Sequence, residues 1–131
     1  MGKASRRKKT RHVLTDLEPN DRKVSTRLAE LVEPHADPDE TRESYEALVG
    51  IGAMAWNLSL MPAADRIDSI REAVRRAVAI GLPLTEWWLT ELVERKLLLF
   101  PSDDRFIESF EVVEAPDDRF TVIVASLTAG N

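Results

Sequence analysis

The chain has 131 residues, of which 44% are hydrophobic and 31% are charged, proportions typical of one folded domain rather than of a disordered chain. It contains no cysteine, which excludes disulfides, thiolate nucleophiles and cysteine-based zinc sites. The formal net charge is −5, and it is divided very unevenly along the chain.

The first twelve residues are strongly basic. They carry six basic side chains and no acidic one, namely Lys3, Arg6, Arg7, Lys8, Lys9 and Arg11. The remaining residues include twelve basic and 23 acidic side chains, a net charge of −11. A block of like charge cannot fold on itself. We therefore expect a disordered basic arm over residues 1–19 and a single acidic domain over residues 20–131.

Such an arm is suited to binding a polyanion. Lysine and arginine side chains release counterions from a phosphate backbone, and six contacts give a log–log salt slope of about −4 to −5. The arm has no aromatic residue for stacking on single-stranded bases. The sequence therefore favours non-specific contact with nucleic acid or the ribosome. The alternatives are a solvated tail without a partner and a tail that folds back weakly on the acidic body.

Targeting and membrane signals are weak. No apolar stretch follows the basic residues as a secretory signal requires. The longest uncharged run, residues 47–64, has a helical part of only about 22 Å, short of a bilayer core. We expect a cytoplasmic protein without a membrane partner. The segment from Arg6 to Lys9 would serve as a nuclear localisation signal in a eukaryote.

Four helices are predicted from apolar residues at helical spacing and from their end signals. The first covers Asp21–Glu33. The second begins at a capping pattern of Asp37, Pro38 and Glu40 and runs to about Leu60, and its glycines predict close packing against a neighbouring helix. The third runs from Pro62 to about Ile80 with Gly81 at its end, and the fourth from the capping residue Thr85 to about Leu99.

Several helical side chains are assigned to a face. The apolar stripe of the third helix consists of Ile67, Ile70, Val74, Ala77 and Val78. In the fourth helix we expect Trp88, Leu89, Leu92 and Val93 to point inward and Glu91 and Arg95 to form an exposed pair.

The period changes from 3.6 to 2 after Pro101. Residues 105–114 and 119–127 are rich in valine, isoleucine and phenylalanine and flank a turn at residues 115–118, which predicts a β-hairpin. Two strands alone are marginal in water, so the hairpin must pack on the helices or pair with another chain. The fold class is therefore α+β, with about four helices followed by a C-terminal antiparallel hairpin.

Two segments resemble known binding motifs in part. Residues 50–55 match a dinucleotide-binding fingerprint, but the residues before them are helical where that motif needs a strand. The third and fourth helices, joined through Gly81, have the spacing of a helix-turn-helix motif, with Ala77 four residues before that glycine. Their second helix carries Glu86, Glu91 and Glu94, which would repel phosphates. Because of the spacing of these two helices, a sequence-specific DNA-binding regulator is kept as the alternative function.

Catalytic, cofactor and metal sites are not indicated. Neither His12 nor His35 has a recognisable catalytic partner. The tetrapeptide Asp-Asp-Arg-Phe occurs at residues 103–106 and 117–120, at opposite ends of the predicted hairpin, so its carboxylates cannot share an ion. We expect no enzyme, no cofactor and no metal.

Adjacent Trp87 and Trp88 cannot both face inward, because successive helical residues are about 100° apart. Trp88 belongs to the apolar stripe, so Trp87 is the interface candidate. The hypothesis is a non-enzymatic binding or regulatory module, with a protein partner or homodimer on the body and a polyanion on the arm. A dimer would either join the hairpins into a larger sheet or cover Trp87.

Overall fold

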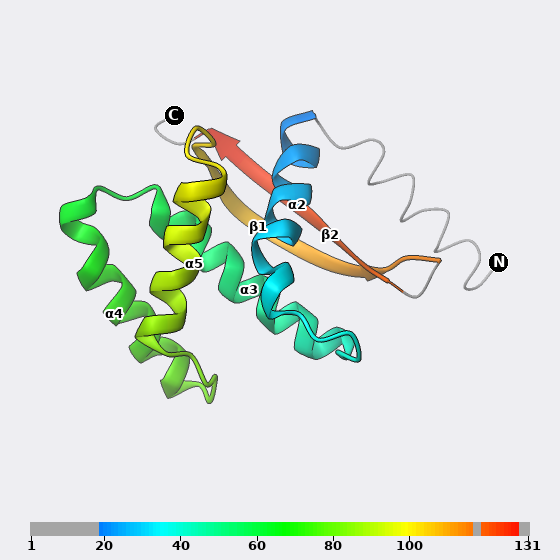
Figure 1. Cartoon of the computed structure of the whole chain (residues 1–131), viewed down its shortest axis with the longest axis horizontal. Coiled ribbons are helices and arrows are strands. Elements are labelled where there is room, and N and C mark those ends of the chain that lie inside the picture. Colours follow the sequence, from blue (N-terminus) through cyan, green and yellow to red (C-terminus); the bar gives the residue numbers. More distant parts are fainter. Residues whose placement is uncertain (1–18, 117–118, 129–131) are drawn as a thin grey trace.

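The computed structural model describes residues 19–116 and 119–128. Four helices precede a two-stranded antiparallel hairpin (Figure 1). The elements are α2 (Pro19–Val32), a short 3-10 turn (Glu33–His35), α3 (Arg42–Ser59), α4 (Ala63–Ala79), α5 (Glu86–Leu99), β1 (Arg105–Glu114) and β2 (Phe120–Thr128). The predicted fold class is confirmed. Residues 1–18 of the predicted arm lie outside the described residues, whereas Pro19, predicted as its last residue, begins α2.

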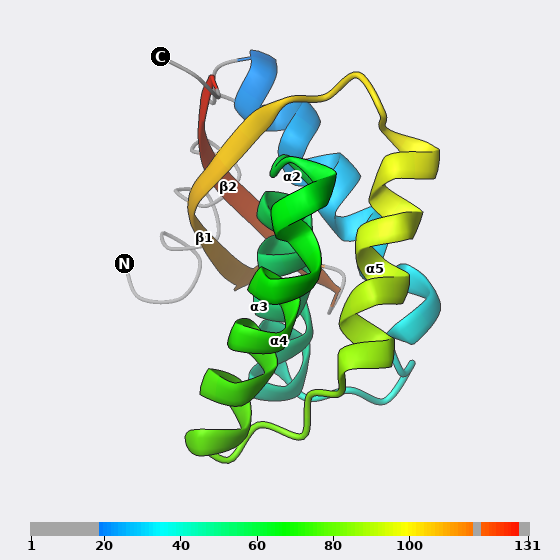
Figure 2. The same ribbon diagram turned by 90° about the vertical axis from the view of Figure 1, so that its left-hand side faces the viewer.

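The helix α3 is the centre of the fold, since it contacts α2, α4, α5 and both strands. The hairpin lies on one side of the molecule and α5 on the opposite side, with α3 between them (Figure 2). The largest fully buried side chain, Trp56, comes from α3. A single core therefore joins residues of α2, α3, α5 and the hairpin, while α4 supplies only two buried apolar residues.

The two glycines of α3 let neighbouring elements approach closely. A Cβ atom on Gly52 would lie 2.3 Å from Val32 Cγ1, so α2 packs directly against the backbone of α3 there. A Cβ atom on Gly50 would lie 3.4 Å from the ring of Phe110 in the hairpin. The predicted helix contact holds for Gly52, whereas Gly50 faces a strand. The fingerprint-like segment lies wholly inside α3.

The predicted start of the second helix was wrong by four residues. The side chain of Asp37 accepts a hydrogen bond from the backbone N–H of Asp39 at 2.9 Å, and the carbonyl of Asp37 accepts one from Glu40 at 3.0 Å. These bonds close a turn instead of starting a helix. The helix begins after Thr41, whose hydroxyl accepts the N–H of Ser44 at 3.1 Å.

The end of α4 follows the prediction, and its apolar stripe follows it only in part. Gly81 has a φ of 88°, the left-handed conformation expected after a helix C-terminus. Ile70 and Ala77 are buried as predicted, but Ile67 and Val78 are 58% and 57% exposed. Their exposure follows from the packing of α4, whose main contacts are with α3 and α5, so that it buries a narrow strip.

The predicted exposed pair of Glu91 and Arg95 in α5 was also wrong. The guanidinium of Arg95 instead donates to the carbonyl oxygens of Leu31 and Glu30, both at 3.1 Å. These carbonyls lie at the C-terminus of α2, where the helix leaves acceptors without intrahelical partners. A cation there is also favoured by the helix dipole. Arg95 therefore joins α5 to the end of α2.

The hairpin packs on the helices, which is one of the two arrangements predicted for it; the other was pairing with another chain. Its strands pair from Arg105 with Thr128 to Glu114 with Phe120, with a bulge between Ile107 and Ser109. One face is buried against α2 and α3, and the other face carries the exposed cross-strand pair Phe106 and Leu127. No described helix is both long enough and apolar enough to cross a lipid bilayer.

Candidate functional site

Of the predicted site residues, Trp87 alone lies in the described part of the chain. The six basic residues of the arm fall outside it, so their contacts stay a prediction. Trp87 is 74% exposed in the first turn of α5, whose cap is Thr85. Its neighbour Trp88 turns inward and donates its indole N–H to His35 Nδ1 at 3.2 Å. The predicted division between the two tryptophans is confirmed.

Trp87 belongs to one exposed stripe along α5. Residues 87, 91, 94 and 98 recur at helical spacing, and all four are exposed. We call this set the α5 stripe; it consists of Trp87, Glu91, Glu94 and Leu98. Leu98 is 80% exposed, so the stripe has a large apolar side chain at each end and two carboxylates between them.

A groove of about 310 Å³ runs beside the stripe, between α4 and α5. Its apolar walls include Ile67 and Ile70 of α4 and Val93 and Leu97 of α5. Glu94 lines the groove and also belongs to the α5 stripe. The exposed Ile67 therefore adds to the apolar surface around the stripe.

The helix proposed to read DNA, α5, exposes three carboxylates. In Figures 1 and 2, α4 and α5 run side by side in opposite directions. Glu86, Glu91 and Glu94 are exposed on α5, and Glu86 forms an ion pair with Arg71 of α4 at 3.3 Å. Phosphates would meet two further carboxylates on this helix. The DNA-regulator hypothesis rests on the spacing of the two helices alone.

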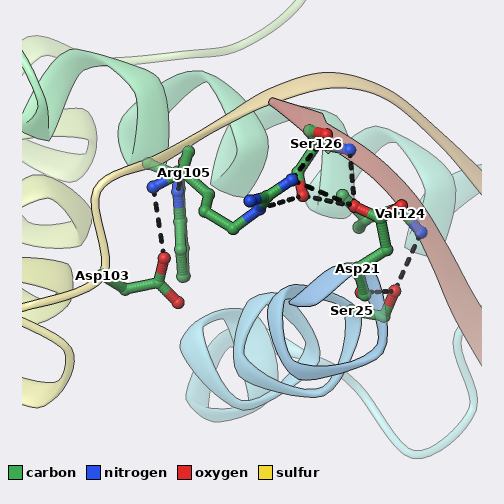
Figure 3. Close-up of polar contacts among 7 residues, drawn as sticks. Asp21, Ser25, Asp103, Arg105, Val124 and Ser126 are labelled. Carbon is green, nitrogen blue, oxygen red and sulfur yellow. Dashed lines mark hydrogen bonds and ion pairs between the residues drawn. The ribbon is translucent and has the colours of Figure 1, made fainter. Parts of the chain in front are cut away.

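A polar cluster that the sequence did not predict joins α2 to the hairpin (Figure 3). The carboxylate of Asp21 accepts hydrogen bonds from the backbone N–H of Ser126, at 2.9 Å, and from its hydroxyl. The guanidinium of Arg105 donates to the hydroxyl of Ser126 at 2.8 Å and to its carbonyl at 3.0 Å. Ser25 accepts the N–H of Val124 at 2.9 Å.

Side chains from two helices thus occupy both outer edges of the hairpin near its open end. On the β2 side these are Asp21 and Ser25 of α2. On the β1 side, Asn57 of α3 accepts the N–H of Ile107 at 2.8 Å and donates to its carbonyl at 2.9 Å. Trp56 donates its indole N–H to the carbonyl of Arg105 at 2.7 Å. Another strand cannot pair with these positions.

Lys96 is a second polar group that the sequence left unassigned. It is 1% exposed, its ammonium donates to the carbonyl of Asp103 at 2.5 Å, and it lies 4.9 Å from the ring centre of Trp56. Burial lowers the pKa of Lys96, and the carboxylates of Asp103 and Asp104 oppose that shift. Arg27 pairs with Asp103 at 2.6 Å. Asp103 is therefore an ion-pair partner of Arg27 and an acceptor for Lys96.

These clusters hold the fold together. Each polar atom named in them already has a partner within the protein. Across residues 19–116 and 119–128, no group of three or more histidine, aspartate or glutamate side chains is placed to hold a metal ion. The sequence contains one sign of the cluster around Asp21. Ser126 is polar, but it occupies an inward strand position in line with Val122 and Val124.

Comparisons with known proteins leave the family open. No protein-family model, no curated protein and no solved structure matches the chain. The function is therefore inferred from the residues of this molecule alone.

Proposed function

We propose that the protein is a non-enzymatic binding module, in which the α5 stripe contacts a protein and the basic arm contacts nucleic acid or another polyanion. The exposed Trp87 is the observation that supports this most directly. A tryptophan is rarely left so open, and tryptophan is among the residues that contribute most binding energy at protein interfaces.

The remainder of the stripe supports the same proposal. Leu98 lies three turns from Trp87 on the same side of α5, and Ile67 of α4 lines the adjoining groove. Together they offer apolar surface on both sides of two carboxylates. The partner surface would then carry apolar side chains flanking a basic one. A second copy of the chain is one such partner.

The charge division supports the proposed role of the arm. The body, residues 20–131, carries a net charge of −9 and would repel a polyanion, so we assign the contact to the six basic residues. A cytoplasmic location fits the absence of cysteine and would give access to nucleic acid.

Fluorescence anisotropy with a labelled single-stranded RNA and a labelled DNA duplex tests the arm. The full chain is compared with a variant in which all six basic arm residues are changed to glutamine. We expect the full chain to bind with a log–log salt slope of about −4 to −5 and the variant to lose binding. Equal binding by the two chains would refute the role of the arm. Protection of one defined DNA site by both chains would favour the regulator hypothesis.

Light scattering and affinity purification test the α5 stripe. A variant with Trp87→Ala and Leu98→Ala is compared with a control carrying Val78→Ala and Ile80→Ala, which are also exposed on the surface. We expect the stripe variant to lose the protein partner, or the dimer, that the wild type and the control retain. Nuclease treatment separates this partner from proteins held through nucleic acid. A partner kept by both variants would contradict the proposal.

A further inference from the structure

The most acidic part of the described chain is the segment from Glu30 to Glu46. It contains seven acidic residues and one basic residue, Arg42, which gives a net charge of −6. The acidic residues are Glu30, Glu33, Asp37, Asp39, Glu40, Glu43 and Glu46. All are exposed except Glu40, which is partly buried. None of them takes part in an ion pair found among the described residues.

This segment supplies one part of the wall of a second groove, of about 440 Å³, between α2 and the hairpin. We call it the acidic groove; its walls include Ala29, Glu30, Glu33, Ala36, Tyr45 and Phe120. Ala36 and Tyr45 both line the groove. The chain segment that connects these two residues carries four carboxylates, those of Asp37, Asp39, Glu40 and Glu43. Arg119 is the basic residue on the hairpin side. The groove thus combines apolar walls with the carboxylates of Glu30 and Glu33 and the guanidinium of Arg119.

Two observations show that the charge acts within this region. Burial raises the pKa of Tyr45, and the carboxylates of Glu40 and Glu33 raise it further. One carboxylate oxygen of Glu40 is buried and has no hydrogen-bond donor among the described residues. A buried acceptor without a partner is unfavourable, so this oxygen adds to the unbalanced negative charge of the segment.

We propose that residues Lys3–Arg11 of the same chain dock in the acidic groove and that a polyanion competes with the groove for them. This rests on the proposed contact between the arm and a polyanion, and it makes the groove a regulator of that contact. The charges match, since residues Lys3–Arg11 carry +6 and the segment Glu30–Glu46 carries −6.

The length of the connecting chain agrees with docking in the same molecule. The arm joins the body at Pro19, at the N-terminus of α2, while the groove lies toward the C-terminal half of that helix. The 14 residues of α2 span about 21 Å. The seven residues between Arg11 and Pro19 reach about 23 Å when extended. A short tether also gives the arm a high effective concentration at the groove.

Paramagnetic relaxation in solution tests where the arm lies. The chain has no cysteine, so Ser5→Cys provides a single attachment point for a spin label on the full chain. We expect selective loss of amide signal at Glu30–Glu46 and at Phe120 in low salt. The loss should disappear in 1 M salt, where the Debye length falls to about 3 Å. It should also disappear when single-stranded RNA is added. Signal loss spread evenly over the body, or unaffected by salt, would overturn the proposal.

A matched pair of charge variants tests the competition. One carries Glu33→Gln, Asp39→Asn and Glu43→Gln, and its control carries Asp65→Asn, Asp68→Asn and Glu108→Gln. All six residues are exposed and each variant changes the net charge by +3. If the arm is docked in nine molecules of ten, freeing it raises RNA affinity about tenfold. We expect that gain, and loss of the relaxation effect, only in the first variant. Equal gains in both variants would overturn the proposal.

Two further outcomes keep this proposal separate from the proposed function. If the wild type binds no RNA, the polyanion contact of the arm fails, whereas the relaxation measurement still decides whether the arm docks. Mixing labelled chains with isotope-labelled, spin-free chains detects docking between two molecules. Signal loss at the groove in that mixture would overturn docking within the same chain.

Discussion

Asp21 connects the first described helix to the last strand through two hydrogen bonds to Ser126, and it also lies 3.9 Å from Arg105. We expect Asp21→Ala to lower the free energy of unfolding by roughly 2–3 kcal/mol, because it removes the charged acceptor of the N–H and the hydroxyl of Ser126. Chemical denaturation measures this loss. Asp65→Ala is the control, since Asp65 also lies in the first turn of a helix but is exposed. Equal losses would contradict the role of the cluster.

Lys96 gives the second prediction, which concerns pH. Its pKa is lowered in the folded protein from an ordinary value of 10.5, so the unfolded chain holds this proton more tightly. Stability therefore rises as the pH increases through the folded pKa toward 10.5. We expect the wild type to gain stability relative to Lys96→Met over that alkaline range. Both proteins contain Tyr45, so the contribution of its shifted pKa is the same in the two stability curves and cancels in their difference. Parallel stability curves for the two proteins would refute the prediction.

Sequence reasoning found Trp87 and missed Asp21, Arg105 and Lys96. Trp87 could be assigned because two adjacent tryptophans cannot share one helical face. Charged residues are usually solvated, so a sequence offers no reason to bury a particular aspartate or lysine. The partners of Asp21 and Lys96 were fixed only when α2, α5 and the hairpin came together. Such pairs depend on tertiary packing.

The contact between α2 and α3 provides a prediction at the scale of secondary structure. Gly52→Ala would place its new methyl group 2.3 Å from Val32 Cγ1 and 3.3 Å from Leu28 Cδ1. We expect a loss of roughly 1–2 kcal/mol, because overpacking outweighs the gain of about 1 kcal/mol in helix propensity. Gly50→Ala is the control, since its methyl group meets only the ring of Phe110 at 3.4 Å. Thermal unfolding compares the two, and a more stable Gly52→Ala protein would contradict the expectation.

The elements themselves were largely predictable, because helix ends and the change of period leave local marks. The caps at Thr85 and Gly81 and the strand Arg105–Glu114 agree with the sequence. The start of α3 was missed because the residues from Asp37 to Glu40 suit a turn as well as a helix cap. The exposure of Ile67 could not be foreseen, since periodicity shows an apolar face without showing what covers it.

At the scale of the whole molecule, the elements differ in how firmly they are held. The helix α4 buries only Ile70 and Ala77, whereas α2 and the hairpin share a buried core and the Asp21 cluster. We expect local opening of α4 before global unfolding. Native-state hydrogen exchange should then show fast amides along α4 and slow amides at Val124 and Ser126. Equal protection of α4 and β2 would refute this.

The contacts of α2 with β2 also bear on how the chain is made. Ser25 and Val124 are 99 residues apart, and Asp21 and Ser126 are 105 apart, so both bonds join the two ends of the folded body. During synthesis, α2 emerges first and stays without these partners until β2 has been translated. Long-range contacts of this kind also slow folding. A chain stopped before Phe120 would expose the apolar face of α2, which makes incomplete translation products targets for chaperones and proteases.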